Sequence, residues 1–168
     1  MSGRIFLLGD NIDTDQLAPG RYMSGGIAEI AAHCLEAVRP DFAATVRPGD
    51  ILVAGRNFGA GSSREQAAEA LRHLGLAGVV ALSFAGIFYR NALNLGLPAL
   101  VAPDLGGIDD GDEGLLDPMA GRLTLVAKQT EVALEPLPEN LRPLLIDGGL
   151  IPHLKKRLSA GAANARRP

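Results

Sequence analysis

Short, continuous apolar runs alternate with longer amphipathic stretches over the first hundred residues of the chain. Continuous apolar runs of this length are typical of strands that are buried on both faces of a sheet. The runs are residues 5–8, 51–54, 79–82 and 99–101. The segments between them are rich in helix formers, and a Pro or Gly ends each one: residues 28–38, 62–74 and 85–95. This alternation of strand and helix predicts a parallel α/β core.

The pattern changes after residue 103. Residues 104–117 contain six acids and four glycines without the alternating acids of a calcium-binding loop, so we expect an exposed linker. Residues 123–126 and 132–134 predict a late antiparallel pair of strands, which makes the sheet mixed but largely parallel. Residues 141–158 predict one or two closing helices. We therefore expect a single α/β domain over residues 1–158, followed by a basic, disordered tail at 159–168.

Composition and charge narrow the class of protein. The 168 residues suit one compact domain, and with 47% hydrophobic but only 4% aromatic residues its core must be largely aliphatic. The net charge is −3, yet five of the 16 Lys and Arg residues lie in 155–168, so the rest of the chain is clearly acidic. An acidic body argues against a nucleic-acid partner. Because no signal peptide is visible and the apolar stretch 79–88 is too short to span a bilayer, we expect a cytoplasmic protein without a membrane partner.

The chain contains a single cysteine, Cys34. One thiol excludes an internal disulfide, an all-cysteine zinc site and an iron–sulfur cluster held by this chain alone. We therefore expect no metal site in the chain. Cys34 stands among Ala31, Ala32 and Leu35, and we expect it to be a small buried hydrophobe.

The stretch from Gly55 to Ala67 carries the strongest candidate chemistry. A buried strand ends there, a glycine-rich loop follows and a helix begins, so backbone N–H groups can converge on an anion. Two nucleotide-binding motifs do not fit this stretch. A P-loop requires a Gly-Lys pair, which the chain lacks, and the dinucleotide fingerprint requires a small residue where Arg64 stands.

Ser62, Ser63 and Arg64 together favour a carboxylate ligand. Ser62 and Glu65 have the spacing of a capping box, which predicts a helix starting at Ser62 and is a sufficient role for both residues. Capping does not account for Arg64, because a cation in the first turn opposes the helix dipole. An anion held between the hydroxyls, the guanidinium and free N–H groups would account for it, and a serine in such surroundings could act as a base. The histidines are scattered and offer no triad: His33, His73 and His153.

Three segments resemble the small "swivel" domain of the aconitase superfamily. Residues 57–65 (Asn-Phe-Gly-Ala-Gly-Ser-Ser-Arg-Glu) resemble its signature, residues 9–15 (Gly-Asp-Asn-Ile-Asp-Thr-Asp) its first loop, and residues 83–92 a following strand-to-helix segment. Their order and spacing over residues 4–155 are similar to those of the free-standing small subunits of 3-isopropylmalate dehydratase and its homoaconitase-like relatives. The resemblance implies one three-layer β/β/α swivelling domain.

The same resemblance implies an activity. Members of this family isomerise hydroxy-di- or tricarboxylic acids by removing water and adding it back at the adjacent carbon. A separate large subunit carries a 4Fe–4S cluster, so the resemblance implies a heteromer and no cofactor bound by this chain. It places Ser62 on the catalytic base, and Ser63, Arg64 and Asp15 on substrate-binding positions.

Other positions of the signature are implied to be structural or variable. Asp13 and Thr14 fall on positions that shape the first loop. Ala60 and Gln66 stand where the family often has Cys and His, and neither change touches the implied chemistry.

The loop after residue 15 bears on the substrate, because in the family it reads the variable arm of the hydroxy acid. Relatives that act on homoaconitate-like acids place an Arg directly after an aromatic–aliphatic pair, whereas here Ser24 follows Tyr22 and Met23. Met23 suits an apolar arm, while Arg21 could reach a carboxylate if the loop turned inward. We predict isopropylmalate, a substrate of leucine biosynthesis, with dimethylmalate or a homocitrate-type acid as alternatives. From a different class, a free-standing carboxylate-binding module without activity of its own stays open.

Overall fold

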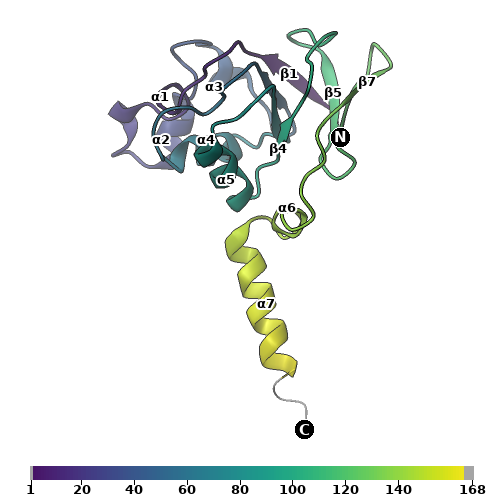
Figure 1. Ribbon diagram of the computed structural model, residues 1–168. Helices are drawn as coiled ribbons and strands as arrows, with labels where there is room; N and C mark the ends of the chain where they lie inside the picture. The colour runs from purple at the N-terminus through teal and green to yellow at the C-terminus, as the bar shows by residue number, and fades with distance from the viewer. Residues whose placement is uncertain (1, 165–168) are drawn as a thin grey trace.

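The computed structural model describes residues 2–164, with side chains to residue 160. Its centre is one seven-stranded sheet in the order β4-β3-β2-β1-β5-β6-β7. The strands are β1 Gly3–Leu7, β2 Ile51–Ala54, β3 Gly78–Ala81, β4 Ala99–Val101, β5 Glu113–Asp117, β6 Arg122–Leu125 and β7 Thr130–Ala133. The helices are α1 Thr14–Leu17, the 3₁₀ turn η1 Gly20–Tyr22, α2 Ile27–Ala32, α3 Phe42–Thr45, α4 Gln66–His73, α5 Gly86–Asn94, α6 Arg142–Ile146 and α7 Leu150–Asn164. Figure 1 shows strands β1, β4, β5 and β7 of the sheet above helix α7.

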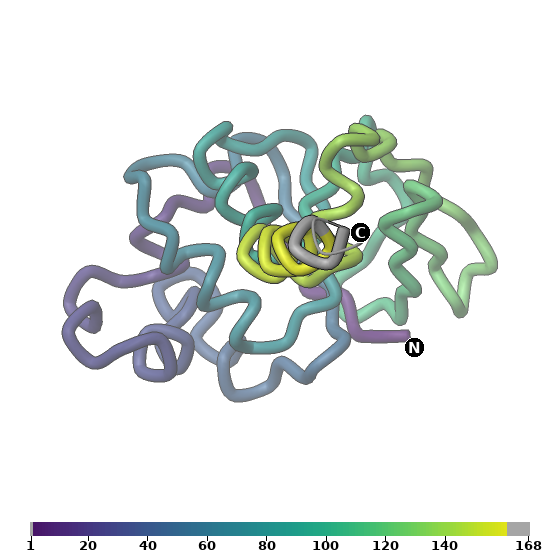
Figure 2. The backbone as a smooth tube through the Cα atoms, turned by 90° about the horizontal axis from the view of Figure 1, so that it is seen from below, coloured from purple at the N-terminus to yellow at the C-terminus, as the bar shows by residue number. Residues whose placement is uncertain are grey.

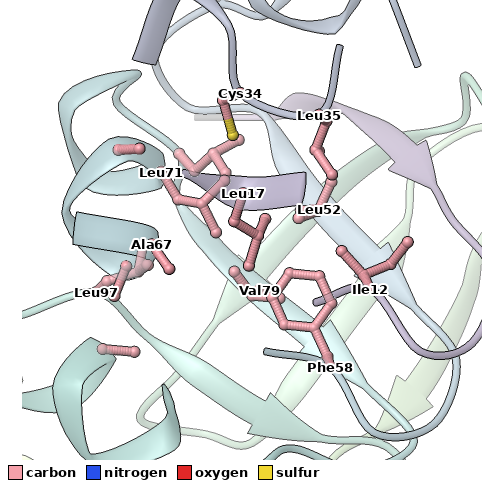
Figure 3. Close-up of a cluster of buried hydrophobic side chains, with 14 of the residues drawn as sticks. Ile12, Leu17, Cys34, Leu35, Leu52, Phe58, Ala67, Leu71, Val79 and Leu97 are labelled. Carbon is pink, nitrogen blue, oxygen red and sulfur yellow. The ribbon is translucent and has the colours of Figure 1, made fainter. Parts of the chain in front are cut away.

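Strands β1 to β4 form the parallel half of the sheet, as their apolar runs predict. The pairs β1–β2, β2–β3 and β3–β4 are all parallel, with Leu52, for example, opposite Phe6 and Val79. Helices α1 to α5 cover one face of this half, and apolar side chains from each of them form a cluster with the strands (Figure 3). Cys34 is buried within this cluster, which confirms its expected role as a hydrophobe, and burial raises the pKa of its thiol.

Strands β5 to β7 form the antiparallel half and fold back over the other face. β1 pairs antiparallel with β5, and β5–β6 and β6–β7 continue the hairpins. Leu123 and Leu125 pack with Ile5, Ile51 and Val53 in a second buried cluster. The molecule therefore has three layers, two of strand and one of helix, which confirms the expected β/β/α arrangement. Figure 2 shows the hairpins on the opposite side of the molecule from the segments around residue 30.

Residues 104–112 form a mostly exposed loop, as their acids and glycines predict, but residues 113–117 do not, because β5 occupies this last part of the segment. Gly114 pairs with Gly3, and a Cβ at position 114 would lie 2.9 Å from Cδ1 of Ile5. The absence of a side chain at Gly114 thus leaves room for the Ile5 and Ile51 side chains to pack against β5. Four of the acids in the segment form ion pairs: Asp109 and Asp112 with Lys128, Asp110 with Arg39, and Asp117 with Arg122.

Two helices end or begin at other residues than the sequence predicts. The predicted helix at 28–38 ends at Ala32, and the chain then turns through Leu35, whose φ is +61°. The backbone N–H of Leu35 donates to the carbonyl of Gln16, so a contact with the first loop replaces a helical hydrogen bond. The other case, the start of α4, belongs to the site described below.

The closing segment contains two helices, α6 and α7. Figure 1 shows α7 extending away from the sheet. It continues to Asn164, so the part of the predicted tail at 159–164 is helical, while Arg166 and Arg167 lie outside the described residues. Within residues 2–164, no helix is long and apolar enough to cross a membrane.

Candidate functional site

The three segments of the family signature meet at one edge of the sheet. They follow β1, β2 and β3, and the carboxyl ends of parallel strands lie at the same edge. Backbone hydrogen bonds join the three loops: Asn11 N–H donates to the carbonyl of Arg56 (2.8 Å), Gly59 N–H to that of Ile12 (2.7 Å) and Phe58 N–H to that of Ser83 (3.0 Å). The segments therefore form one connected loop cluster.

Asn57 and Gly59 give the loop after β2 its shape. Both have a positive φ, +60° and +78°. The Asn57 side chain donates to Oδ1 of Asn11 (3.0 Å), and its backbone N–H donates to Oγ of Ser83 (2.8 Å). A Cβ at Gly59 would lie 2.2 Å from Cγ of the buried Phe88, so only glycine fits there.

Thr14 fixes the position of Ser62. The Thr14 side chain is buried, and its Oγ1 accepts the backbone N–H of Ser62 at 3.0 Å. The same Oγ1 lies 3.1 Å from Oγ of Ser62, and the backbone N–H of Arg64 donates to that Oγ at 3.4 Å. The Ser62 hydroxyl thus accepts one backbone N–H and shares a hydrogen bond with the Thr14 hydroxyl, in which either oxygen can be the donor, and its residue is exposed at the surface. The loop-shaping role expected of Thr14 is confirmed.

The capping-box prediction for Ser62 and Glu65 is wrong. Helix α4 begins at Gln66, and Glu65 at its N-cap makes no side-chain capping hydrogen bond. Ser62 precedes the helix because its N–H and Oγ both engage Thr14, a partner 48 residues away in the sequence. The capping box of this region belongs instead to Asp13 and Gln16 at the start of α1, so Asp13 shapes the first loop as expected.

Arg64 pairs with Asp15. Its Nη1 donates to Oδ1 of Asp15 at 2.8 Å and to the carbonyl of Ala18 at 3.1 Å, while the N–H of Gly20 donates to the same Oδ1 at 3.2 Å. The hydrogen bond from Arg64 lowers the pKa of the Asp15 carboxyl, with a smaller contribution from Gly20. Among the described residues, Nη2 and Nε of Arg64 have no acceptor, so this edge of the guanidinium can take a carboxylate ligand.

Ser63 presents its side chain to solvent beside Ser62. Its backbone carbonyl accepts a hydrogen bond from Nδ2 of Asn91 on α5, at 3.3 Å. Asn91 lies in the third signature segment, to which the sequence assigned no individual role. Its contact connects the α5 segment to residues 57–65, the serine–arginine loop.

The four residues expected to read the substrate arm lie on and just after η1. Arg21 and Ser24 are exposed, whereas Tyr22 and Met23 are half-buried and pack against the helical face of the core. Arg21 forms an ion pair with Glu36, and Tyr22 stacks on His33. Arg21 shares with Asp15 a surface hollow of about 310 Å³. The structure thus brings Arg21 next to Asp15. Glu36 also lines the hollow, and the sequence did not predict this, because an isolated acid in a turn belongs to no recognisable motif.

The described residues contain no group of three His, Cys, Asp or Glu side chains able to hold a metal ion. The buried thiol of Cys34 is held protonated, since burial raises its pKa. These residues do not fit an iron–sulfur cluster, and no step of chemistry is assigned to one on this chain.

Comparison with known proteins places this fold and loop cluster in the aconitase class. Residues 34–104 match the family model of the aconitase C-terminal domain. The methanogen homoaconitase small subunit of Methanothermobacter thermautotrophicus is 47% identical over 95% of this chain and 93% of its own length. The 3-isopropylmalate dehydratase small subunit 2 of Archaeoglobus fulgidus is also 47% identical, over 93% of this chain and 95% of its own.

A crystal structure agrees with the sequence relatives. The 3-isopropylmalate dehydratase structure (leuD) from Methanocaldococcus jannaschii superimposes with a TM-score of 0.92 at 39% identity, covering 97% of this chain and 98% of that one. The chain belongs to the family of aconitase-type small subunits that includes those of 3-isopropylmalate dehydratase and homoaconitase. The resemblance inferred from the three segments is confirmed, and a small subunit implies a large-subunit partner.

Proposed function

We propose that the chain is the small subunit of a two-subunit hydro-lyase that interconverts 2-isopropylmalate and 3-isopropylmalate, in leucine biosynthesis. The observation that carries this proposal is the exposed Ser62 hydroxyl, which accepts the Arg64 backbone N–H, is hydrogen-bonded to the Thr14 hydroxyl and stands beside an Arg64 guanidinium with free N–H groups. Relatives named for this activity cover almost the whole chain, which supports the choice of substrate.

Ser62 is proposed as the base. Isomerisation by loss and return of water requires a proton to leave the carbon next to a carboxylate, and Ser62 Oγ as an alkoxide would take it and later return it. Serine is a weak base in water, so the alkoxide must be stabilised by preorganised donors. Thr14 Oγ1 can donate to Ser62 Oγ across 3.1 Å, and the Arg64 backbone N–H already points at it.

Arg64, Ser63 and Asp15 are proposed to hold the substrate. The free edge of the Arg64 guanidinium suits a bidentate contact to a carboxylate. The exposed Ser63 hydroxyl can donate to the same group. Asp15 holds Arg64 in place through the 2.8 Å ion pair and lines the adjacent hollow, where it can accept a hydrogen bond from a substrate hydroxyl.

A large subunit is proposed to complete the active site. It would supply the 4Fe–4S cluster for which the described residues of this chain offer no ligands. The exposed edge of the sheet that carries Ser62 would then face the large subunit, with the substrate between them.

A second candidate activity is that of a homoaconitase, because a methanogen homoaconitase small subunit is 47% identical to this chain. Its substrates carry one more carboxylate. The residue after Tyr22 and Met23 is an exposed serine and Arg21 is already paired with Glu36, which favours the alkyl substrate.

The decisive experiment is the reconstituted pair of this chain and its cognate large subunit, assayed on 2-isopropylmalate, dimethylmalate and homocitrate. With Ser62→Ala we expect kcat to fall by about a thousandfold or more, with KM little changed, because the base is lost and the binding groups remain. Ser63→Ala, the neighbouring hydroxyl, should mainly raise KM.

Two controls complete the design. Ser159→Ala on α7, far from the loop cluster, should leave both constants unchanged, and circular dichroism should show that every variant is folded. Full activity of Ser62→Ala would contradict its role as base. Tight binding of small carboxylates by the isolated chain, with no activity in the reconstituted pair, would point instead to a carboxylate-binding module.

A further inference from the structure

The hollow beside Asp15 lies next to the proposed site. Its volume of about 310 Å³ is at the lower end of the range of small-ligand sites. Asp15 lines it and is in turn bonded to Arg64, so a group placed in the hollow would be adjacent to a carboxylate bound at Arg64. The lining residues are Asp15, Gln16, Pro19, Gly20, Arg21, Glu36 and Ala37.

Arg21 does not extend freely into this hollow. Its Nη2 donates to Oε1 of Glu36, and its guanidinium carbon lies 4.9 Å from the centroid of the Tyr22 ring. The other Glu36 oxygen, Oε2, is 2.7 Å from Nδ1 of His33, and the His33 ring stacks on Tyr22 with centroids 3.6 Å apart and planes 7° from parallel. Four side chains thus form a closed cycle in which each one holds the next.

Within this cycle, Glu36 is the carboxylate that neutralises the charge of Arg21. Hydrogen bonds from His33 and Arg21 lower its pKa, and Glu36 in turn raises the pKa of Arg21, so both remain charged at neutral pH. Of the charged side chains that line the hollow, Arg21 is neutralised by Glu36 and Asp15 by Arg64. A carboxylate entering the hollow would be repelled by Glu36 and would find no unpaired cation among the described lining residues to bind it. An alkyl group carries no charge and would not be repelled.

We propose that Glu36 is a positioning residue for substrate choice: by holding Arg21, it makes the hollow accept an alkyl arm and reject a further carboxylate. This inference rests on the proposed function, because it assigns the hollow to the variable arm of the hydroxy acid. Selection therefore depends on Glu36 and Arg21 together, in addition to the residues at 22–24.

The test is Glu36→Gln in the reconstituted enzyme, with kcat/KM measured for 2-isopropylmalate and for homocitrate. Glutamine keeps the length of the side chain and a hydrogen bond to His33 but releases the charge of Arg21. We expect the ratio of isopropylmalate to homocitrate kcat/KM to fall on the order of tenfold, chiefly through a lower KM for homocitrate. In the double variant Glu36→Gln/Arg21→Gln this gain should disappear, because no cation is left to bind the carboxylate.

Glu29→Gln is the matched control, an acid on the neighbouring α2 that does not line the hollow, and its substrate ratio should equal that of the unaltered chain. If Glu36→Gln changes both substrates by the same factor, Glu36 is merely structural and the inference is overturned. A preference of the unaltered enzyme for homocitrate would also overturn it, while leaving the hydro-lyase class intact. If the unaltered enzyme acts on no acid of the panel, the proposed function fails, and the inference fails with it.

Discussion

The serine–arginine loop and the 104–112 segment that leads into the antiparallel hairpins both contain glycines and charged side chains. The two regions differ in how far their polar groups are paired within the protein. In the 104–112 segment, the charges are neutralised by ion pairs: Nζ of Lys128, in the turn between β6 and β7, lies 2.7 Å from Asp109 and 2.6 Å from Asp112 and also donates to the carbonyl of Gly107. In the serine–arginine loop, by contrast, Thr14 holds both the backbone and the hydroxyl of Ser62 in place, the Ser62 residue stays exposed, and one edge of the Arg64 guanidinium has no acceptor among the described residues.

This difference separates a structural charge cluster from a candidate site. A cluster whose charges are all internally paired stabilises a fold modestly, because exposed ion pairs contribute little. In the serine–arginine loop, some polar groups form hydrogen bonds that fix the positions of others, and N–H donors remain free. Such a loop is preorganised to bind a ligand. Three substitutions test whether the two regions differ in this way.

The largest effect is expected for Gly59→Ala in the loop. The added Cβ would collide with the Phe88 ring and would have to adopt a φ of +78°, so we expect a loss of about 2–4 kcal/mol in the free energy of unfolding. Urea denaturation followed by circular dichroism measures this loss. Gly9→Ala is the control, since a Cβ there meets no atom within 4 Å; equal losses for both glycines would show that packing against Phe88 does not shape the loop.

A smaller effect is expected for Thr14→Val, which removes the hydroxyl that positions Ser62. We expect kcat of the reconstituted enzyme to fall on the order of tenfold to a hundredfold, with a loss of unfolding free energy of about 1 kcal/mol. Thr14→Ser keeps the hydroxyl and should recover most of the activity. An active Thr14→Val enzyme would mean that Ser62 needs no donor from this residue.

The smallest effect is expected for Asp110→Asn, in the 104–112 segment that leads into β5. The hydrogen bond from Arg39 holds the pKa of Asp110 below its usual value, with a smaller contribution from the Leu7 N–H. Because the folded-state pKa is the lower one, the stabilisation is present above about pH 3.9 and is lost as the pH falls through the folded-state value. The variant should thus be less stable than the unaltered chain by under about 1 kcal/mol at pH 7, and the difference should shrink toward pH 3.

Activity should not change in Asp110→Asn, and Asp104→Asn serves as the control. Asp104 is an exposed acid of the same segment whose carboxylate accepts only the N–H of Gly106 among the described residues. Its substitution removes no ion pair from the part of the chain that the structure describes and should therefore change the free energy of unfolding at pH 7 less than Asp110→Asn does. A loss of activity in Asp110→Asn would contradict the distinction between the two regions, because it would show that a charge of the 104–112 segment contributes to the site.

The sequence predicted the parallel strands, the glycine loop and the family, because each depends on residues close together in the chain. Apolar runs mark buried strands, and the loop motif is contiguous from Asn57 to Glu65. The acids and glycines of 104–117 did not predict β5, because this strand is defined by its pairing with β1 and β6, which are distant in the sequence. The ion pair of Arg21 and Glu36 could not be predicted either, because no local pattern in the sequence relates these two residues.

By itself, the sequence determined the order of the elements, the layered α/β class and the chemical groups of the candidate site, since these follow from local pattern and residue type. The tertiary structure alone decided where α4 begins, which carboxylate faces Arg64 and what holds Arg21. The physical reason is the same in each case. A hydroxyl, an acid or a guanidinium takes the partner that the fold brings within 3 Å or so of it, and for Ser62 and Arg64 those partners lie 48 and 49 residues away along the chain.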